Sequence, residues 1–232
     1  MEKKNNGLLA AALIIAAFVL GWALKMPVSA LKQYDRTVAV RGLATREVKA
    51  DYAIAPFAFS LLGNDLQDLY REVQQKNKIV IAYLKAAGIT DDEITVGSPS
   101  FEDRRTWDNN SGYIYQMSSV VTVGTTKVDN VIDLKMRQGE LMEKGVAMSA
   151  DNWQHAATYS FKGLNDIKPA MIEEATKSAR GAAQKFADDS DSKLGKIKSA
   201  TQGQFSISDR DSNTPYIKDV RVVTYVDFYL KD

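Results

Sequence analysis

The stretch that decides the fold is residues 46–87, REVKADYAIAPFAFSLLGNDLQDLYREVQQKNKIVIAYLKAA. In its first part, residues 46–60, apolar and polar residues alternate from Val48 to Ile54, which is the pattern of a half-buried strand. After Pro56 the larger apolar residues change parity. Because proline has no N–H to donate to a ladder, we expect a bulge or a sheet edge there.

The second part, residues 65–87, is the clearest helix of the chain. Gly88 follows it directly, and Asn77 lies on its apolar stripe. A buried amide is costly without partners, so we expect Asn77 to hydrogen-bond a neighbouring element, with ligand contact as the alternative. The stripe consists of Leu66, Leu69, Val73, Val80 and Leu84.

Working outward from this strand and helix, the same periodicities place the remaining elements. Strands are expected at 37–42, 94–106, 112–124, 151–162, 196–207 and 218–230, and helices at 127–144 and 168–189. Residues 46–162 then have the order β-α-β-β-α-β. This order predicts an α+β fold with a split βαβ-like core, followed by an additional helix and C-terminal strands. No linker divides residues 31–232, so we expect a single body.

The last helix and the last strand carry the clearest surface patterns. The inward stripe of residues 168–189 is mostly small and should allow close packing; it consists of Ile172, Ala175, Ala179, Ala182 or Ala183, and Phe186. On the last strand, Tyr225 and Tyr229 share the face opposite the apolar one. That face is either solvated or an interface, where tyrosine is enriched.

Composition excludes several classes of protein. Cysteine is absent and His155 is the only histidine, which removes disulfide scaffolds, thiolate nucleophiles and the usual zinc sites. A Ser-His-Asp triad would have to use His155, which lies among aromatic residues and reads as a packed or rim histidine. The net charge of +1 over 232 residues lacks the basic footprint of a nucleic-acid-binding protein.

The sequence also lacks the familiar catalytic and phosphate-binding signatures. Asp209, Asp211 and Asn213 have the opening spacing of a calcium loop, but Thr214 replaces the required Gly and Val220 the bidentate Glu, so a turn is expected. We therefore predict no catalytic, cofactor-binding or metal-ligating residue, and no enzyme activity.

The amino-terminal segment predicts export. Residues 7–24 are uncharged, follow Lys3 and Lys4, and would span about 27 Å as a helix, which favours an uncleaved anchor. Cleavage after Ala30 is the alternative, because Val28-Ser29-Ala30 suits a signal peptidase. In either case residues 1–30 are the targeting segment, and we expect residues 31–232 to be exported.

Six pieces of the chain carry a resemblance to a known family: residues 38–42, Asn77 with residues 83–89, residues 92–95, Gly112-Tyr113, the alanine-rich residues 175–187, and residues 193–197. In their order and spacing, over residues 37–230, the chain resembles the SIMPL-domain, or YggE-like, proteins of bacterial envelopes. The resemblance implies a location on the periplasmic side of the bacterial inner membrane, ring-like oligomers and a role in tolerance of oxidative or other envelope stress, without a family-wide catalytic residue.

The main hypothesis is a non-enzymatic, membrane-tethered protein that forms a homo-oligomer, with no nucleic-acid partner. Its candidate contact residues are Arg104, Arg105 and Trp107 at the hairpin tip and Tyr225 and Tyr229 on the last strand. Two alternatives stay open: an envelope hydrolase whose carboxylate or serine site is assembled in space, and a monomeric periplasmic module that binds a partner along a strand edge.

Overall fold

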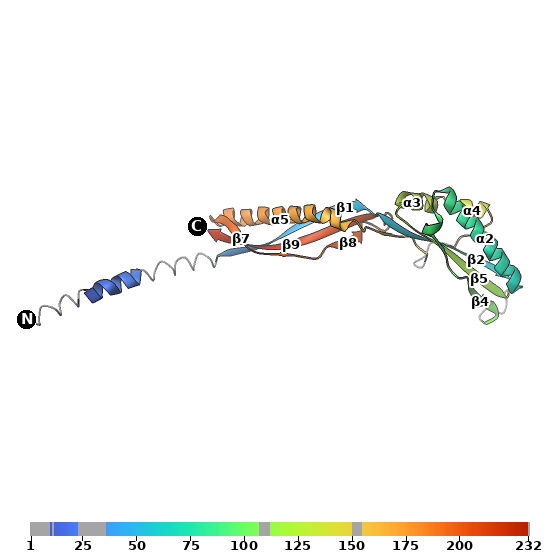
Figure 1. Ribbon diagram of the computed structural model, residues 1–232, viewed down its shortest axis with the longest axis horizontal. Coiled ribbons are helices and arrows are strands. Elements are labelled where there is room, and N and C mark those ends of the chain that lie inside the picture. The colour runs from blue at the N-terminus through green and yellow to red at the C-terminus, as the bar shows by residue number, and fades with distance from the viewer. Residues whose placement is uncertain (1–9, 11, 23–35, 107–111, 150–154, 232) are drawn as a thin grey trace, which may run out of the picture. The chain divides into compact units, whose positions relative to one another are not determined.

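The structure is a computed structural model that describes residues 10, 12–22, 36–106, 112–149 and 155–231 (Figure 1). Where the sequence predicted one body, the contacts from residue 36 onward divide the chain into two compact units. The expected boundary between residues 30 and 31 lies outside the described residues. Among these, unit 1 contains 36–46, 168–206 and 221–231, and unit 2 contains the described parts of 47–167 together with 207–220.

Unit 2 contains the predicted split βαβ core. Its described strands have the order β3-β5-β2-β6, with β4 also on β5, and all of these neighbours pair antiparallel. Along the chain, β3 and β4 act as one interrupted strand, because Pro99 between them has no N–H. The strands are β2 (Tyr52–Gly63), β3 (Ile94–Val96), β4 (Ser100–Asp103), β5 (Tyr115–Thr125) and β6 (Thr158–Ser160).

One face of this sheet is covered by α2 (Leu66–Ala86), α3 (Val128–Met136) and α4 (Glu140–Glu143). The Asp65 carboxylate accepts the N–H of Asp68 and caps α2, and Gly88 ends it at positive φ. Asn77 is buried and its Oδ1 accepts the Ser119 hydroxyl at 2.9 Å, which confirms the expected hydrogen bond. The core therefore forms between the α2 stripe and the inward rows of β2 and β5.

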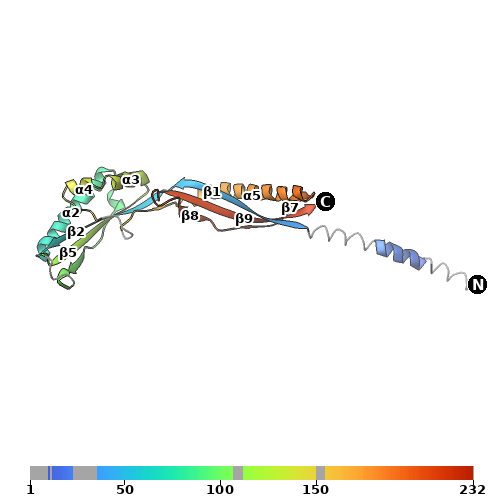
Figure 2. The same ribbon diagram turned by 180° about the vertical axis from the view of Figure 1, so that it is seen from behind.

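Unit 1 is a sheet with one helix across it (Figures 1 and 2). The described strand order is β1-β9-β7, with β8 also on β9. Its elements are β1 (Thr37–Lys49), α5 (Leu164–Asp189), β7 (Lys193–Gln202), β8 (Ser206–Asp209) and β9 (Ile217–Lys231), and β1, α5, β8 and β9 also supply residues to unit 2.

One expectation for the first strands is wrong, because the break between them lies at Ala50 and Asp51 rather than at residues 43–45. Of the two alternatives expected at Pro56, there is no bulge, since Pro56 pairs with Thr122 in unbroken register, but there is a local sheet edge. The Pro56 carbonyl accepts Lys135 Nζ at 3.1 Å, so the backbone at Pro56 faces away from β5, beyond the end of β6, where no ladder donor is needed.

The helices also differ from the predicted stripes. Residues 127–144 form two helices, and the break at residues 137–139 resets the helical phase, so Met136 is 81% exposed while Leu134 and Leu141 are buried. The last helix starts at Leu164 rather than 168. Its buried stripe is Met171, Ala175, Ala179, Ala183 and Ala187, with Phe186 exposed.

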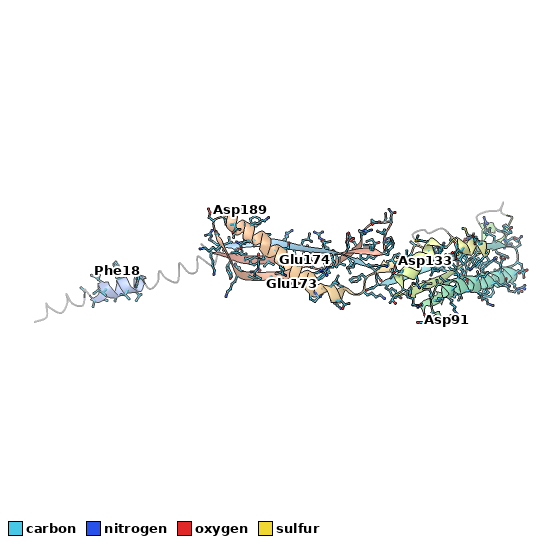
Figure 3. All side chains as sticks on the ribbon, turned by 90° about the horizontal axis from the view of Figure 1, so that it is seen from above. Phe18, Asp91, Asp133, Glu173, Glu174 and Asp189 are labelled. Atoms are coloured by element: carbon cyan, nitrogen blue, oxygen red, sulfur yellow. The ribbon has the colours of Figure 1, made fainter. Side chains whose placement is uncertain are left out.

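The amino-terminal helix is described for residues 12–22. Its apolar side chains, including that of Phe18, are exposed (Figure 3). Within the described residues, no helix has the length and apolar character that crossing a membrane requires.

Candidate interaction surface

The contact between α5 and β1 determines which face of the unit 1 sheet stays open. A Cβ on Gly42 would lie 1.8 Å from the Ala175 carbonyl oxygen and 2.6 Å from the Ala179 nitrogen. Only glycine permits this approach, because any side chain would overlap the helix backbone. The small stripe of α5 thus seats the helix directly on the sheet, as the sequence predicted.

The opposite face of this sheet is not covered by a described helix or strand, and we call it the open face. Leu43 and Tyr225 on it are 46% and 44% exposed. The Arg41 guanidinium lies 5.1 Å from the centre of the Tyr225 ring, and Lys198 Nζ lies 5.7 Å from that of Tyr229. These cation–π contacts hold the tyrosine rings in place on β9.

The open face also carries both signs of charge. Asp227 accepts the Ser199 hydroxyl at 2.5 Å, beside the cations of Arg41 and Lys198. Tyrosine and arginine are enriched where two proteins meet. The arrangement can therefore bind another surface of mixed charge.

The five contact residues predicted from sequence do not form one group. Tyr225 and Tyr229 belong to the open face of unit 1. Arg104 and Arg105 belong to unit 2, in the short η2 helix (Arg104–Thr106). Trp107 lies outside the described residues.

Arg105 is already engaged within its own unit. Its Nε donates to Asp103 Oδ1 at 2.9 Å, and its guanidinium lies 5.8 Å from the centre of the Tyr115 ring. The hydrogen bond from Arg105 lowers the pKa of the Asp103 carboxyl. This internal pairing favours a structural role at the end of β4 over a free contact residue.

Sequence reasoning missed a surface groove of unit 2 between α2 and the β4–β5 pair. Its volume is about 620 Å³, which lies within the range of about 300–1,000 Å³ that is usual for small-ligand sites. Leu66 was expected in the core but is exposed at its rim, as is Phe101. The helix does not extend over β4, so the end of its apolar stripe faces outward; the lining is Leu66, Gln67, Tyr70, Arg71, Phe101 and Met117.

Among the described residues, Glu93 is the carboxyl whose pKa is shifted most, and its role is structural. Glu93 ends the η1 turn (Asp91–Glu93) and accepts hydrogen bonds from the Thr125 hydroxyl at 2.6 Å, the Thr90 N–H at 2.8 Å and Lys127 Nζ at 2.9 Å. The hydrogen bond from Thr125 is the largest cause that lowers the pKa of Glu93 to about 2. Each oxygen of Glu93 is engaged, so this carboxylate joins β3, β5 and the start of α3.

The other polar candidates also lie in turns. Asp211 accepts the N–H groups of Asn213 and Thr214 at 2.8 Å, which forms the turn expected there. His155 lies in a turn before β6 rather than in the strand that the sequence predicted. Among the described residues, no group of three or more His, Asp or Glu side chains is placed to hold a metal ion.

The comparisons with known proteins agree with this fold. The family model SIMPL, described as a protein of unknown function (DUF541), matches residues 38–224. This match spans most of the chain, so the protein belongs to the SIMPL family. The search of the curated proteins finds no match.

Proposed function

We propose that this SIMPL-domain protein is a non-enzymatic, envelope-anchored protein that assembles with further copies of itself through the open face of unit 1. The observation that carries the proposal is the exposed Leu43–Tyr225 patch, with Arg41 placed against the tyrosine ring. Its occupant is a second copy, because a face that carries Arg41, Lys198 and Asp227 together is complementary to itself.

The location follows from the amino-terminal segment. Residues 7–24 anchor the protein in the bacterial inner membrane, and the two units lie on the periplasmic side. An anchor also raises the local concentration of copies, which favours assembly through a modest interface. A contribution to tolerance of envelope or oxidative stress is the biological role that the family resemblance supports.

The test is native mass spectrometry of the full-length protein extracted from membranes in mild detergent. The protomer mass reports whether residues 1–30 are retained, and the complex mass reports assembly. We expect full-length protomers in a defined oligomer. A trimmed monomer would overturn the proposal and favour a soluble binding module or an enzyme.

A pair of variants tests the surface itself. Tyr225→Glu places a charge on the open face and should raise the concentration needed for assembly at least tenfold. Phe186→Glu is the matched control, because Phe186 is 58% exposed on the α5 side of the same unit. Assembly that is unchanged by Tyr225→Glu, with circular dichroism confirming the fold of both variants, would contradict the assignment of this face.

A further inference from the structure

The groove of unit 2 between α2 and the β4–β5 pair has an aromatic ring on each wall (Figure 1). Tyr70 of α2 lines one wall and is 50% exposed, and Phe101 of β4 lines the other and is 47% exposed. Met117 of β5 pairs with Phe101 across the two strands, is buried, and forms the floor. A contiguous apolar patch with a polar rim marks an interaction site, whereas single exposed apolar residues need no explanation.

The Phe101 ring is held by Tyr115, which does not itself line the groove. The two ring centroids are 5.4 Å apart and the ring planes are tilted by 45°. The Tyr115 ring is in turn contacted by the Arg105 guanidinium, whose Nε donates to Asp103. Because these contacts order the Phe101 wall before a ligand arrives, less binding free energy is lost to side-chain ordering.

The composition of the lining indicates the shape of the group that it accepts. Four of its six residues are apolar or aromatic: Leu66, Tyr70, Phe101 and Met117. Aromatic rings contact other rings in offset or edge-to-face geometry, and a thioether sulfur makes favourable contacts with ring edges. These surfaces therefore suit a flat, apolar ring system.

The polar part of the lining indicates the charge of the ligand. It consists of Gln67 and Arg71, both on α2, and Arg71 is the one charged residue among the described residues that line the groove. Arg71 is paired with Asp68, but the two side chains are 73% and 69% exposed. An ion pair this exposed contributes little to stability, so a ligand carboxylate can take the place of Asp68 on the guanidinium.

We propose that this groove binds a small aromatic carboxylate, with its ring system between Tyr70 and Phe101 and its carboxylate on Arg71. The charge of Arg71 selects an anion, and the apolar walls select the ring. The inference goes beyond the proposed assembly, because the site lies wholly within unit 2 and needs no second copy.

The probe for this site is 2-naphthoate, and 2-naphthalenemethanol is its neutral match. Isothermal titration calorimetry measures both compounds on the full-length protein in phosphatidylcholine nanodiscs, with the signal of empty nanodiscs subtracted. We expect one naphthoate per protein copy with a Kd at or below about 1 mM, and binding of the alcohol that is roughly fivefold weaker.

Two results of this titration would overturn the proposal. The first is the absence of saturable naphthoate binding. The second is equal affinity for the two compounds, which would point to an apolar side chain of a protein as the occupant of the groove.

Three variants locate the site. Arg71→Gln should weaken naphthoate binding roughly fivefold and leave the alcohol unaffected. Phe101→Ser and Tyr70→Ser each remove one wall, and each should weaken both compounds about tenfold. Met136→Gln is the matched control, because Met136 is an exposed apolar residue of the same unit that does not line the groove.

Unchanged naphthoate binding in both wall variants, or an equal loss in Met136→Gln, would contradict the assignment of the groove. Circular dichroism checks the fold of every variant. Phe101 and Tyr70 are both about half exposed, so their replacement leaves the buried core in place. If one wall variant proves unfolded, the other decides.

The outcomes separate this inference from the proposed assembly. A monomeric wild-type protein that binds naphthoate overturns the assembly and leaves the groove in place. An oligomer that is sensitive to Tyr225→Glu but does not bind naphthoate overturns the groove and leaves the assembly. Naphthoate affinity should be the same in Tyr225→Glu as in wild type, because Tyr225 belongs to unit 1.

Discussion

At the scale of single residues, two glycines associated with the same helix have opposite surroundings. Gly42 on β1 has no room for a Cβ, because the α5 backbone fills that space. Gly181 within α5 has no atom within 4 Å of the position where its Cβ would lie. One glycine is required by packing, and the other costs helix stability without a packing reason inside the described unit.

We therefore predict that Gly42→Ala lowers the free energy of unfolding by about 3 kcal/mol or more, because the helix must move away from the sheet. Gly181→Ala, the matched control, should raise it by about 0.5–1 kcal/mol. Urea denaturation followed by circular dichroism measures both changes. A neutral Gly42→Ala would show that the close packing of α5 on β1 does not exist in solution.

Glu93 gives a prediction of pH dependence. Its pKa is about 2 in the folded protein and near 4.5 when unperturbed, so its contribution to stability is complete above about pH 4.5 and is lost as the pH falls toward 2. Glu93→Gln should cost about 1–2 kcal/mol at pH 7, less than the whole pKa difference because solvent screens part of it.

The difference in unfolding free energy between wild type and Glu93→Gln should shrink between pH 4.5 and pH 2.5. Asp92→Asn is the control, since Asp92 is exposed on the same turn. If the difference were constant over this range, the carboxylate hydrogen bonds from Thr125 and Thr90 would not be its source.

At the scale of elements, the start of α5 shows how a distant residue can determine a boundary. Asp166 is an acidic residue in the first turn of this helix. In the structure, Asp51 accepts the N–H groups of Lys162 and Gly163, both at 2.7 Å, just before Leu164 begins the helix. The partner is over a hundred residues away in the chain, so local sequence could not reveal it.

Asp51→Ala should therefore lower the unfolding free energy by about 1–3 kcal/mol, because two backbone N–H groups lose a charged acceptor. Asp166→Ala should cost less than about 1 kcal/mol, which is the size of a favourable charge in the first helical turn. Thermal or urea denaturation of the two variants compares them directly. Equal losses would return the capping role to Asp166.

At the scale of the whole molecule, the described chain has two hydrophobic cores, one in each unit. Residues from the start and the end of the range 36–231 combine in unit 1, and the middle of that range builds unit 2. Separate cores can open separately, because local stability follows the contacts within each cooperative unit.

We predict that hydrogen exchange measured by mass spectrometry will show this division. Gly42→Ala should speed exchange in α5 and β7 and leave α2 and β5 protected, and Glu93→Gln should do the reverse. Uniform acceleration across both units in either variant would mean that the two cores unfold as one.

The sequence by itself determined the main order of strands and helices, the SIMPL family and the two faces of β9. The elements and the faces of β9 follow from local periodicity, including the alternation of residues around Tyr225. Turn residues such as Gly88 indicate where elements end. The hydrogen bond of Asn77 could be predicted as well, because a polar residue on a buried stripe needs a partner.

Only the tertiary structure decided which predicted surface residues share a unit, and which of the described strands lie at the edges of the sheets. Arg105 is paired with Asp103 at the end of β4, whereas Tyr225 remains exposed because α5 lies on the opposite face of its sheet. The position of β1 at an edge of the described strands depends on strand order. Strand order is fixed by contacts between residues far apart in the chain, which local periodicity does not report.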